Sequence, residues 1–146
     1  MSNRYIKWED KYNTGYKRID DQHVELIEIA NDLYDYLEHK DSKDDELKNA
    51  FKNALKKTVD YIDYHLHYEE KIMHAIKYDK LLDHSRYHRE FTNEIYNYVK
   101  LYENGSSDSI NSLLKYLKEW FLNHILKTDK EFVREMKNIL KNLENS

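Results

Sequence analysis

Apolar residues recur along this chain in steps of three and four, which is the spacing of a buried stripe on an α-helix. Two such stripes predict helices from about residue 20 to 38 and from about residue 45 to 76: Ile19, His23, Leu26, Ala30, Leu33 and Leu37, then Leu47, Phe51, Ala54, Ile62, His65, Glu69, Ile72 and Ile76. Two more follow: Leu81, His84, His88, Phe91, Ile95, Tyr98 and Tyr102, then Ile110, Leu113, Leu117, Trp120 and His124. The pattern therefore predicts four long helices.

Helix breakers are scarce, since the chain has no proline and only two glycines, Gly15 and Gly105. Four long helices with short connections predict an all-α fold, an up-down-up-down four-helix bundle. Residues 1–18 lack periodicity, and we expect an arm that packs on the bundle through its aromatic side chains, with Gly15 in a turn. Residues 19–129 would form the bundle, and residues 130–146 a short C-terminal helix packed outside it. The whole chain is interpreted as a single domain.

Residues suited to end or begin helices stand near the expected boundaries. Asp79 or Asp83 can cap the third helix, and Ser106 or Ser107 the fourth, because their side chains accept hydrogen bonds from free backbone N–H groups. Gly105 suits the end of the third helix, since glycine readily adopts the left-handed conformation found there.

Polar side chains interrupt all four apolar stripes. These are His23, His65, Glu69, His84, His88 and His124. Residues four apart lie within about 40° of each other around a helix, so His65 points with Glu69, and His84 with His88. A single buried histidine is usually a hydrogen-bonded core residue. Several buried polar side chains at one level of a bundle would lower the stability of the fold by on the order of several kcal/mol if they had no partners. A metal centre would satisfy them together.

The remaining histidines serve as internal controls. His67 and His74 lie on the opposite side of their helix from His65. His39 ends the first helix, where a cation suits the helix dipole. We interpret all three as surface residues.

Five imidazoles exceed the needs of a tetrahedral zinc ion, which indicates two metal ions. Two metals need bridging carboxylates, and Asp129 is the candidate partner of Glu69. Its spacing of five from His124 places the two about 140° apart on a regular helix. If both bind, the helix must loosen into a π-type turn or end between them. Imidazole with carboxylate suits iron better than calcium or magnesium.

Composition excludes several other classes of protein. The formal net charge is -4 with no basic block, which argues against a nucleic-acid partner. The chain has no cysteine, so thiolate metal sites and disulfides are excluded. No apolar stretch approaches the length of a membrane span, and the N-terminus is no secretory signal. We therefore expect a cytoplasmic protein.

Taken together, these residues resemble the pattern of the haemerythrin family, of the bacterial single-domain type. The resemblance runs from Trp8 to about Phe132. The matching positions are Ile19, Asp20, Asp21, Gln22, His23, His65, Glu69, Glu70, Met73, His84, His88, Trp120, His124, Ile125 and Asp129.

The resemblance implies a non-haem centre of two iron ions with an oxo or hydroxo bridge, which binds O2 reversibly. It assigns three ligands to a six-coordinate iron: His84, His88 and His124. It assigns two to the other iron, which keeps an open place for O2: His23 and His65. Two carboxylates would bridge the irons: Glu69 and Asp129.

The resemblance also implies an O2 pocket wall formed by Leu26, Trp120, Phe121 and Ile125. The family usually has leucine where this chain has Phe121. The larger ring either narrows gas access or slows water entry, and so changes the rate of autoxidation, or it only fills core space. The family often has proline at the position of Asp79, which can keep the turn by capping the next helix.

Three classes of function remain open from sequence. The first is an O2-binding protein that is not an enzyme: a carrier, store, scavenger or sensor, monomeric or weakly oligomeric. The second is a di-iron enzyme on the same scaffold, such as an NO reductase, peroxidase or iron-repair protein. The third is a metal-free interaction bundle, which the buried polar residues disfavour. The apolar pocket wall, without an obvious proton donor, favours the first class.

Overall fold

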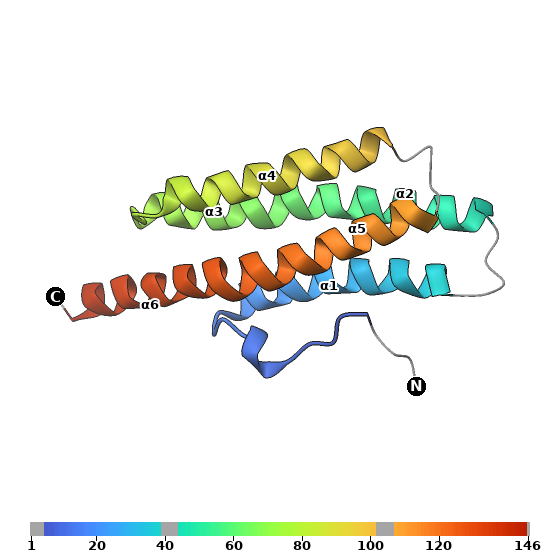
Figure 1. Ribbon diagram of the computed structural model, residues 1–146. Helices are drawn as coiled ribbons and strands as arrows, with labels where there is room; N and C mark the ends of the chain where they lie inside the picture. The colour runs from blue at the N-terminus through green and yellow to red at the C-terminus, as the bar shows by residue number, and fades with distance from the viewer. Residues whose placement is uncertain (1–4, 39–43, 102–106, 146) are drawn as a thin grey trace.

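A computed structural model describes residues 5–38, 44–101 and 107–145, without the side chains of Asp44, Ser107 and Ile125. Four helical rods lie side by side and alternate in direction (Figure 1). The first rod is α1 (Lys17–Glu38), and the third is α4 (Leu81–Lys100). The second comprises α2 (Asp44–Tyr61), a π-helical segment η2 (Ile62–Leu66) and α3 (His67–Ala75). The fourth comprises α5 (Ser107–Trp120), a π-helical segment η4 (Phe121–Asp129) and α6 (Lys130–Glu144). The predicted up-down-up-down bundle is confirmed.

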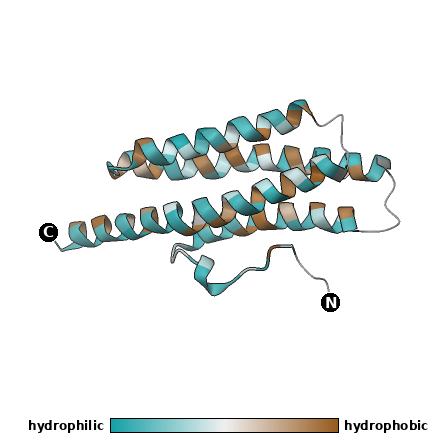
Figure 2. Cartoon of the chain, viewed as in Figure 1, coloured by the Kyte–Doolittle hydropathy of each residue, from teal (hydrophilic) through white to brown (hydrophobic). Residues whose placement is uncertain are grey.

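The predicted stripes face the interior. Apolar and polar positions alternate around every helix (Figure 2). The fully buried members include Phe51, Phe91, Ile95, Leu113 and Leu117. None of the helices in the described part of the chain is long and apolar enough to cross a membrane.

The N-terminal arm packs on the bundle as expected. Its short 3-10 helix η1 (Asp10–Tyr12) brings the buried ring of Tyr12 edge-on to Phe121, with ring centroids 5.0 Å apart. The backbone of Ile6 exchanges two hydrogen bonds with the Asn31 amide, at 2.8 and 2.9 Å. Gly15 has a φ of 90°, which confirms the expected turn.

The turn between α3 and α4 differs from the prediction. The N-cap residue of α4 is Lys80 and makes no side-chain capping hydrogen bond, so the predicted capping by Asp79 or Asp83 is wrong. The end of α3 shapes the turn instead. Lys77 has a φ of 56°, its N–H donates to His74 O at 3.2 Å, and the N–H of Tyr78 donates to Met73 O at 2.9 Å. These two bonds form a Schellman motif, in which a left-handed residue satisfies the free carbonyls of the helix.

The C-terminal segment also differs from the prediction. We expected a helix outside the bundle, but α6 continues the fourth rod directly from η4. The continuous helix carries its apolar residues over the end of the bundle. Six buried side chains form a second core cluster there: Ile19, Met73, Tyr78, Phe132, Val133 and Met136. The predicted signals at Ser106, Gly105 and Tyr102, and the side chain of Ser107, lie outside the described residues.

Candidate metal centre

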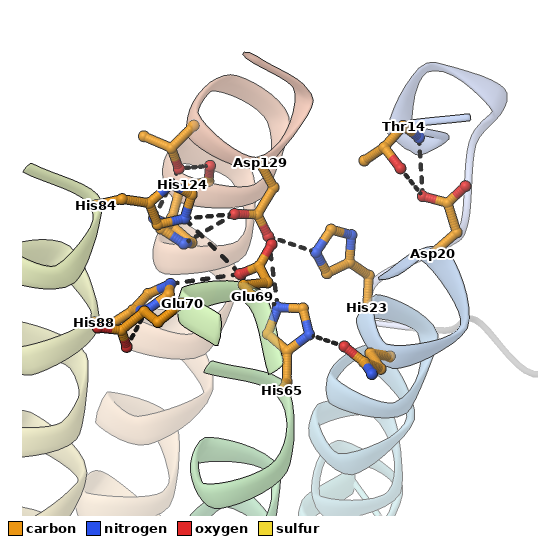
Figure 3. A network of polar contacts seen from close by, with 12 residues as sticks. Thr14, Asp20, His23, His65, Glu69, Glu70, His84, His88, His124 and Asp129 are labelled. Atoms are coloured by element: carbon orange, nitrogen blue, oxygen red, sulfur yellow. Dashed lines mark hydrogen bonds and ion pairs between the residues drawn. The ribbon is translucent and has the colours of Figure 1, made fainter. Parts of the chain in front are cut away.

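Seven buried side chains from all four rods converge on one region of the bundle interior (Figure 3). They fall into two groups, each with ligand atoms within 4.8 Å of one another. The first group is Glu69, His84, His88, His124 and Asp129. The second group is His23, His65, Glu69 and Asp129. The structure thus brings together every residue that the sequence analysis proposed as a metal ligand.

The two carboxylates belong to both groups and lie between the histidines. Asp129 contacts His23 Nε2 through Oδ2 at 2.7 Å and His84 Nε2 through Oδ1 at 2.8 Å. Oε1 of Glu69 lies 3.1 Å from His65 Nε2 and 3.4 Å from His88 Nε2. Each carboxylate therefore reaches histidines of both groups, as a bridging ligand must.

The fourth rod reaches this arrangement through its π-helical segment. His124 and Asp129 both lie in η4, and both are buried. A π-helix bonds residue i to residue i+5, so a five-residue spacing returns to the same side of the helix. The predicted loosening between His124 and Asp129 is confirmed.

The second rod contains a π-helical segment that the sequence analysis missed. η2 carries His65, and α3, which follows it, carries Glu69. The four-residue spacing of this pair already fits a regular helix, so the sequence held no reason to expect a distortion.

Outer hydrogen bonds orient three of the five imidazoles. Nδ1 of His88 donates to Glu70 Oε2 at 3.0 Å, and the Ser85 hydroxyl donates to the other oxygen of Glu70 at 2.6 Å. Nδ1 of His65 donates to the Gln22 side-chain oxygen. A histidine whose Nδ1 carries the proton presents the lone pair of Nε2, and here Nε2 faces the centre.

The third outer contact comes from Thr128. Its hydroxyl donates to the carbonyl of His124 and accepts a hydrogen bond from His124 Nδ1 at 2.8 Å. Thr128 follows His124 by four residues, a spacing that places both on one face.

The atoms at the centre lack hydrogen-bond partners among the described residues. They are the Nε2 atoms of His65, His84, His88 and His124, both carboxylate oxygens of Glu69, and Oδ1 of Asp129. Buried polar atoms without a partner raise the free energy of the folded state. All are metal-ligand atoms that converge on two adjacent positions, so these residues fit a dinuclear metal centre.

The electrostatics of the protein alone leave the two carboxylates in different states. Burial, together with the negative charge of Asp129, raises the pKa of Glu69 well above its usual value. Burial also acts to raise the pKa of Asp129, but the neighbouring imidazole of His124 and the close contacts with His23, His65 and His84 hold it well below the usual range. Burial lowers the pKa of His23 and that of His124, which keeps both imidazoles neutral. Ionising both carboxylates therefore requires additional positive charge, which metal cations supply.

A family model described as "Hemerythrin HHE cation binding domain" matches residues 14–136. The chain belongs to the haemerythrin family. It is 28% identical to a protein named Bacteriohemerythrin from Clostridium acetobutylicum, over 86% of this chain and 97% of that protein. It is 27% identical to Bacteriohemerythrin from Pseudomonas aeruginosa, over 95% of this chain and 86% of that protein.

A more distant relative agrees with this membership, and a solved structure shares the fold. The chain is 26% identical to Myohemerythrin from Theromyzon tessulatum, over 84% of this chain and 87% of that protein. The crystal structure of a leucine-to-phenylalanine mutant has a TM-score of 0.73 at 22% identity, over 91% of this chain and 98% of that one. This likeness shows a shared fold.

The four positions that the haemerythrin resemblance placed in an O2 pocket wall have different surroundings. Leu26 and Phe121 are fully buried, and Phe121 contacts the aromatic residues of the arm. Trp120 stacks on His124, with ring centroids 4.3 Å apart. The side chain of Ile125 lies outside the described residues.

The prediction of a surface position is confirmed for two of the three control histidines, and the orienting residues had no predicted role. His67 and His74 are exposed, and His39 lies outside the described residues. Gln22 and Glu70 were part of the family pattern, each next to a proposed ligand, but nothing in the sequence indicated which imidazole they contact. Their partners belong to other rods, so only the packed bundle defines them.

Proposed function

We propose that this protein binds O2 reversibly at a di-iron centre held by the seven converging side chains. The observation that carries the proposal is the pair of shared carboxylates, Glu69 and Asp129, each within reach of histidines from both groups. Relatives named bacteriohemerythrin and myohemerythrin support it.

The unequal division of histidines supports an unequal pair of irons. His84, His88 and His124 would hold one iron, and His23 and His65 the other. With Glu69 and Asp129 shared, the second iron has one protein ligand fewer, which leaves a coordination place open. The two irons, when bound, would supply the electrons and the open place that O2 requires.

The protein around the cluster holds its ligands in place and offers few protons. Glu70 is held by His88 and Ser85, and the hydrogen bond from His88, larger than the opposing effect of burial, lowers the pKa of Glu70, which keeps it ionised. Burial raises the pKa of Tyr61 well above its usual value, so its phenol keeps its proton. A pocket with few groups able to deliver protons favours reversible binding over reductive cleavage of O2.

To test this proposal, anaerobic protein loaded with two Fe(II) per chain is mixed with O2, and the gas is then removed. The expected result is a visible charge-transfer band that appears with O2 and disappears on its removal over repeated cycles. Irreversible oxidation, with turnover of peroxide or NO, would instead indicate an enzyme and would contradict the proposal. A chain that takes up no iron would contradict the di-iron assignment itself.

A further inference from the structure

The proposed ligands are almost completely enclosed, so metal ions must pass other side chains to reach them. His23, His65, Glu69 and Asp129 have no exposed surface, and the remaining ligands are at most 3% exposed. The route of entry therefore has to be found in the grooves that border the cluster.

One groove, of about 460 Å³, lies between α1 and α2 beside the His23 and His65 half. We name it the acidic groove, and its charged lining residues are Glu25, Glu28, Asp32, Lys57 and Asp60. Four carboxylates thus face one ammonium group. Within the described residues, none of these five side chains forms an ion pair.

Tyr61 connects the acidic groove to the metal centre. Its side chain lines the groove and is 3% exposed. Its ring stacks on His65, with centroids 4.8 Å apart and an interplanar angle of 17°. Its hydroxyl has no hydrogen-bond partner among the described residues, although it is buried. A buried hydroxyl without a partner destabilises the fold, and a water molecule of a hydrated cation could form the missing hydrogen bond.

Carboxylates lie on both sides of Tyr61. Glu25 lines the acidic groove together with Tyr61. On the inner side, Nε2 of His65, on whose ring Tyr61 stacks, lies 3.5 Å from Oδ2 of Asp129. Carboxylates arranged in this way concentrate cations and guide them inward.

We propose that the acidic groove is an entry site for divalent iron, which collects hydrated Fe2+ and passes it beside Tyr61 to His65 and His23. This inference rests on the proposed di-iron function, and it assigns a role to residues outside the metal centre. Carboxylate oxygens suit a hydrated divalent ion that must bind weakly and then leave.

A second groove provides the matched comparison. It has a volume of about 450 Å³ and borders the other half of the centre, with Trp120 and His124 among its lining residues. Its charged residues are Glu90, Glu119 and Lys127. Two carboxylates against one ammonium group make it a weaker attractor for cations than the acidic groove.

The test measures how fast metal-free protein takes up metal under anaerobic conditions. Fe2+ uptake is stopped at timed intervals with a chelator, and Co2+ serves as a second probe, followed by its visible ligand-field band. We expect the double variant Glu28→Gln/Asp32→Asn to load about three- to tenfold more slowly at low ionic strength. The deficit should shrink at high salt, where exposed charges are screened. Both proteins should still reach two metal ions per chain.

The control is the double variant Glu90→Gln/Glu119→Gln, which removes the same charge at the second groove and should load at the wild-type rate. Tyr61→Phe keeps the stacked ring without the hydroxyl, and we expect slower loading with unchanged final stoichiometry. Equal loading rates in the acidic-groove variant and the wild type, with full stoichiometry in both, would overturn the entry site alone. Failure of the wild type to bind two ions would overturn the di-iron proposal together with it.

Discussion

The two halves of the metal centre differ in how firmly the protein holds their imidazoles. In the half formed by His84, His88 and His124, a carboxylate orients His88 and a hydroxyl orients His124. In the other half, a neutral amide orients His65, and Nδ1 of His23 has no hydrogen-bond partner among the described residues.

This difference separates a firmly held half from a more open one. A carboxylate behind an imidazole makes it a stronger donor to a metal and fixes its ring. The firmly held half is also the one with three histidines. The open half adjoins Tyr61 and the acidic groove. The protein thus combines a firmly held group of histidines with a neighbouring position suited to exchange, which agrees with the open coordination place proposed for the iron at His23 and His65.

Removal of a proposed ligand should have the largest effect. His84→Ala should lose iron from the firmly held half and lower the melting temperature, since a ligand present at a thousand times its Kd stabilises a fold by about 4 kcal/mol. Asp129→Ala should lose iron from both halves because its carboxylate is shared. Iron content and thermal melts report both effects. His67→Ala is the control and should change neither; wild-type iron content in His84→Ala would contradict the ligand assignment.

Changing an orienting residue tests the difference more finely. Glu70→Gln should weaken metal affinity by about 10- to 100-fold, as loss of an outer hydrogen-bond partner typically does. Ser85→Ala should weaken metal affinity less, because it removes only one of the contacts of Glu70. Gln22→Ala should also weaken metal affinity less than Glu70→Gln, because a neutral hydrogen-bond acceptor is weaker than a charged one. Competitive metal titrations give the affinities. Equal losses of metal affinity in Glu70→Gln and Gln22→Ala would contradict the difference between the two halves.

Metal affinity should rise with pH. Without metal, burial and the charge of Asp129 raise the pKa of Glu69, so this carboxyl holds a proton that a metal must displace. Burial opposes protonation of His88, but its contact with Glu69 and its hydrogen bond to Glu70 outweigh burial and raise its pKa. Below these pKa values, each displaced proton should change the affinity by up to about tenfold per pH unit. Zinc titrations in weak buffer would detect the released protons, and a pH-independent affinity without proton release would contradict this coupling.

The position of Phe121 gives a smaller expected effect. The ring is fully buried and contacts Trp8 and Tyr12 of the arm. If it slows water entry, Phe121→Leu should autoxidise faster, and a tenfold change would correspond to about 1.4 kcal/mol in the barrier. Decay of the oxygenated form would be followed by absorbance. Equal rates in the variant and the wild type would show that Phe121 only fills core space.

The smallest effect concerns the turn that joins α3 to α4. Lys77 occupies a left-handed conformation that glycine adopts without strain. Lys77→Gly should therefore raise the free energy of unfolding by about 0.5–1 kcal/mol. Chemical denaturation would measure the change, and iron stoichiometry should stay the same. Destabilisation by this substitution would show that the lysine side chain contributes more than its backbone strain costs.

Local sequence alone was sufficient to predict the helices and the proposed ligand positions. Both follow from local periodicity, because a helix places residues three and four apart on one face whatever surrounds it. The same local geometry predicted either a π-type turn or a helix end between His124 and Asp129, since a spacing of five cannot face one side of a regular helix. The structure has the π-helical segment.

Features that depend on contacts between rods became visible only in the folded structure. The partner of Glu70 is His88, 18 residues away, and the partner of Gln22 is His65, 43 residues away. The course of α6 depended on a buried surface formed by Ile19, Met73 and Tyr78, which exists only after the bundle has packed. The acidic groove likewise combines side chains of α1 and α2. Periodicity tells which face of a helix turns inward, but it carries no information about which residue of another helix lies opposite.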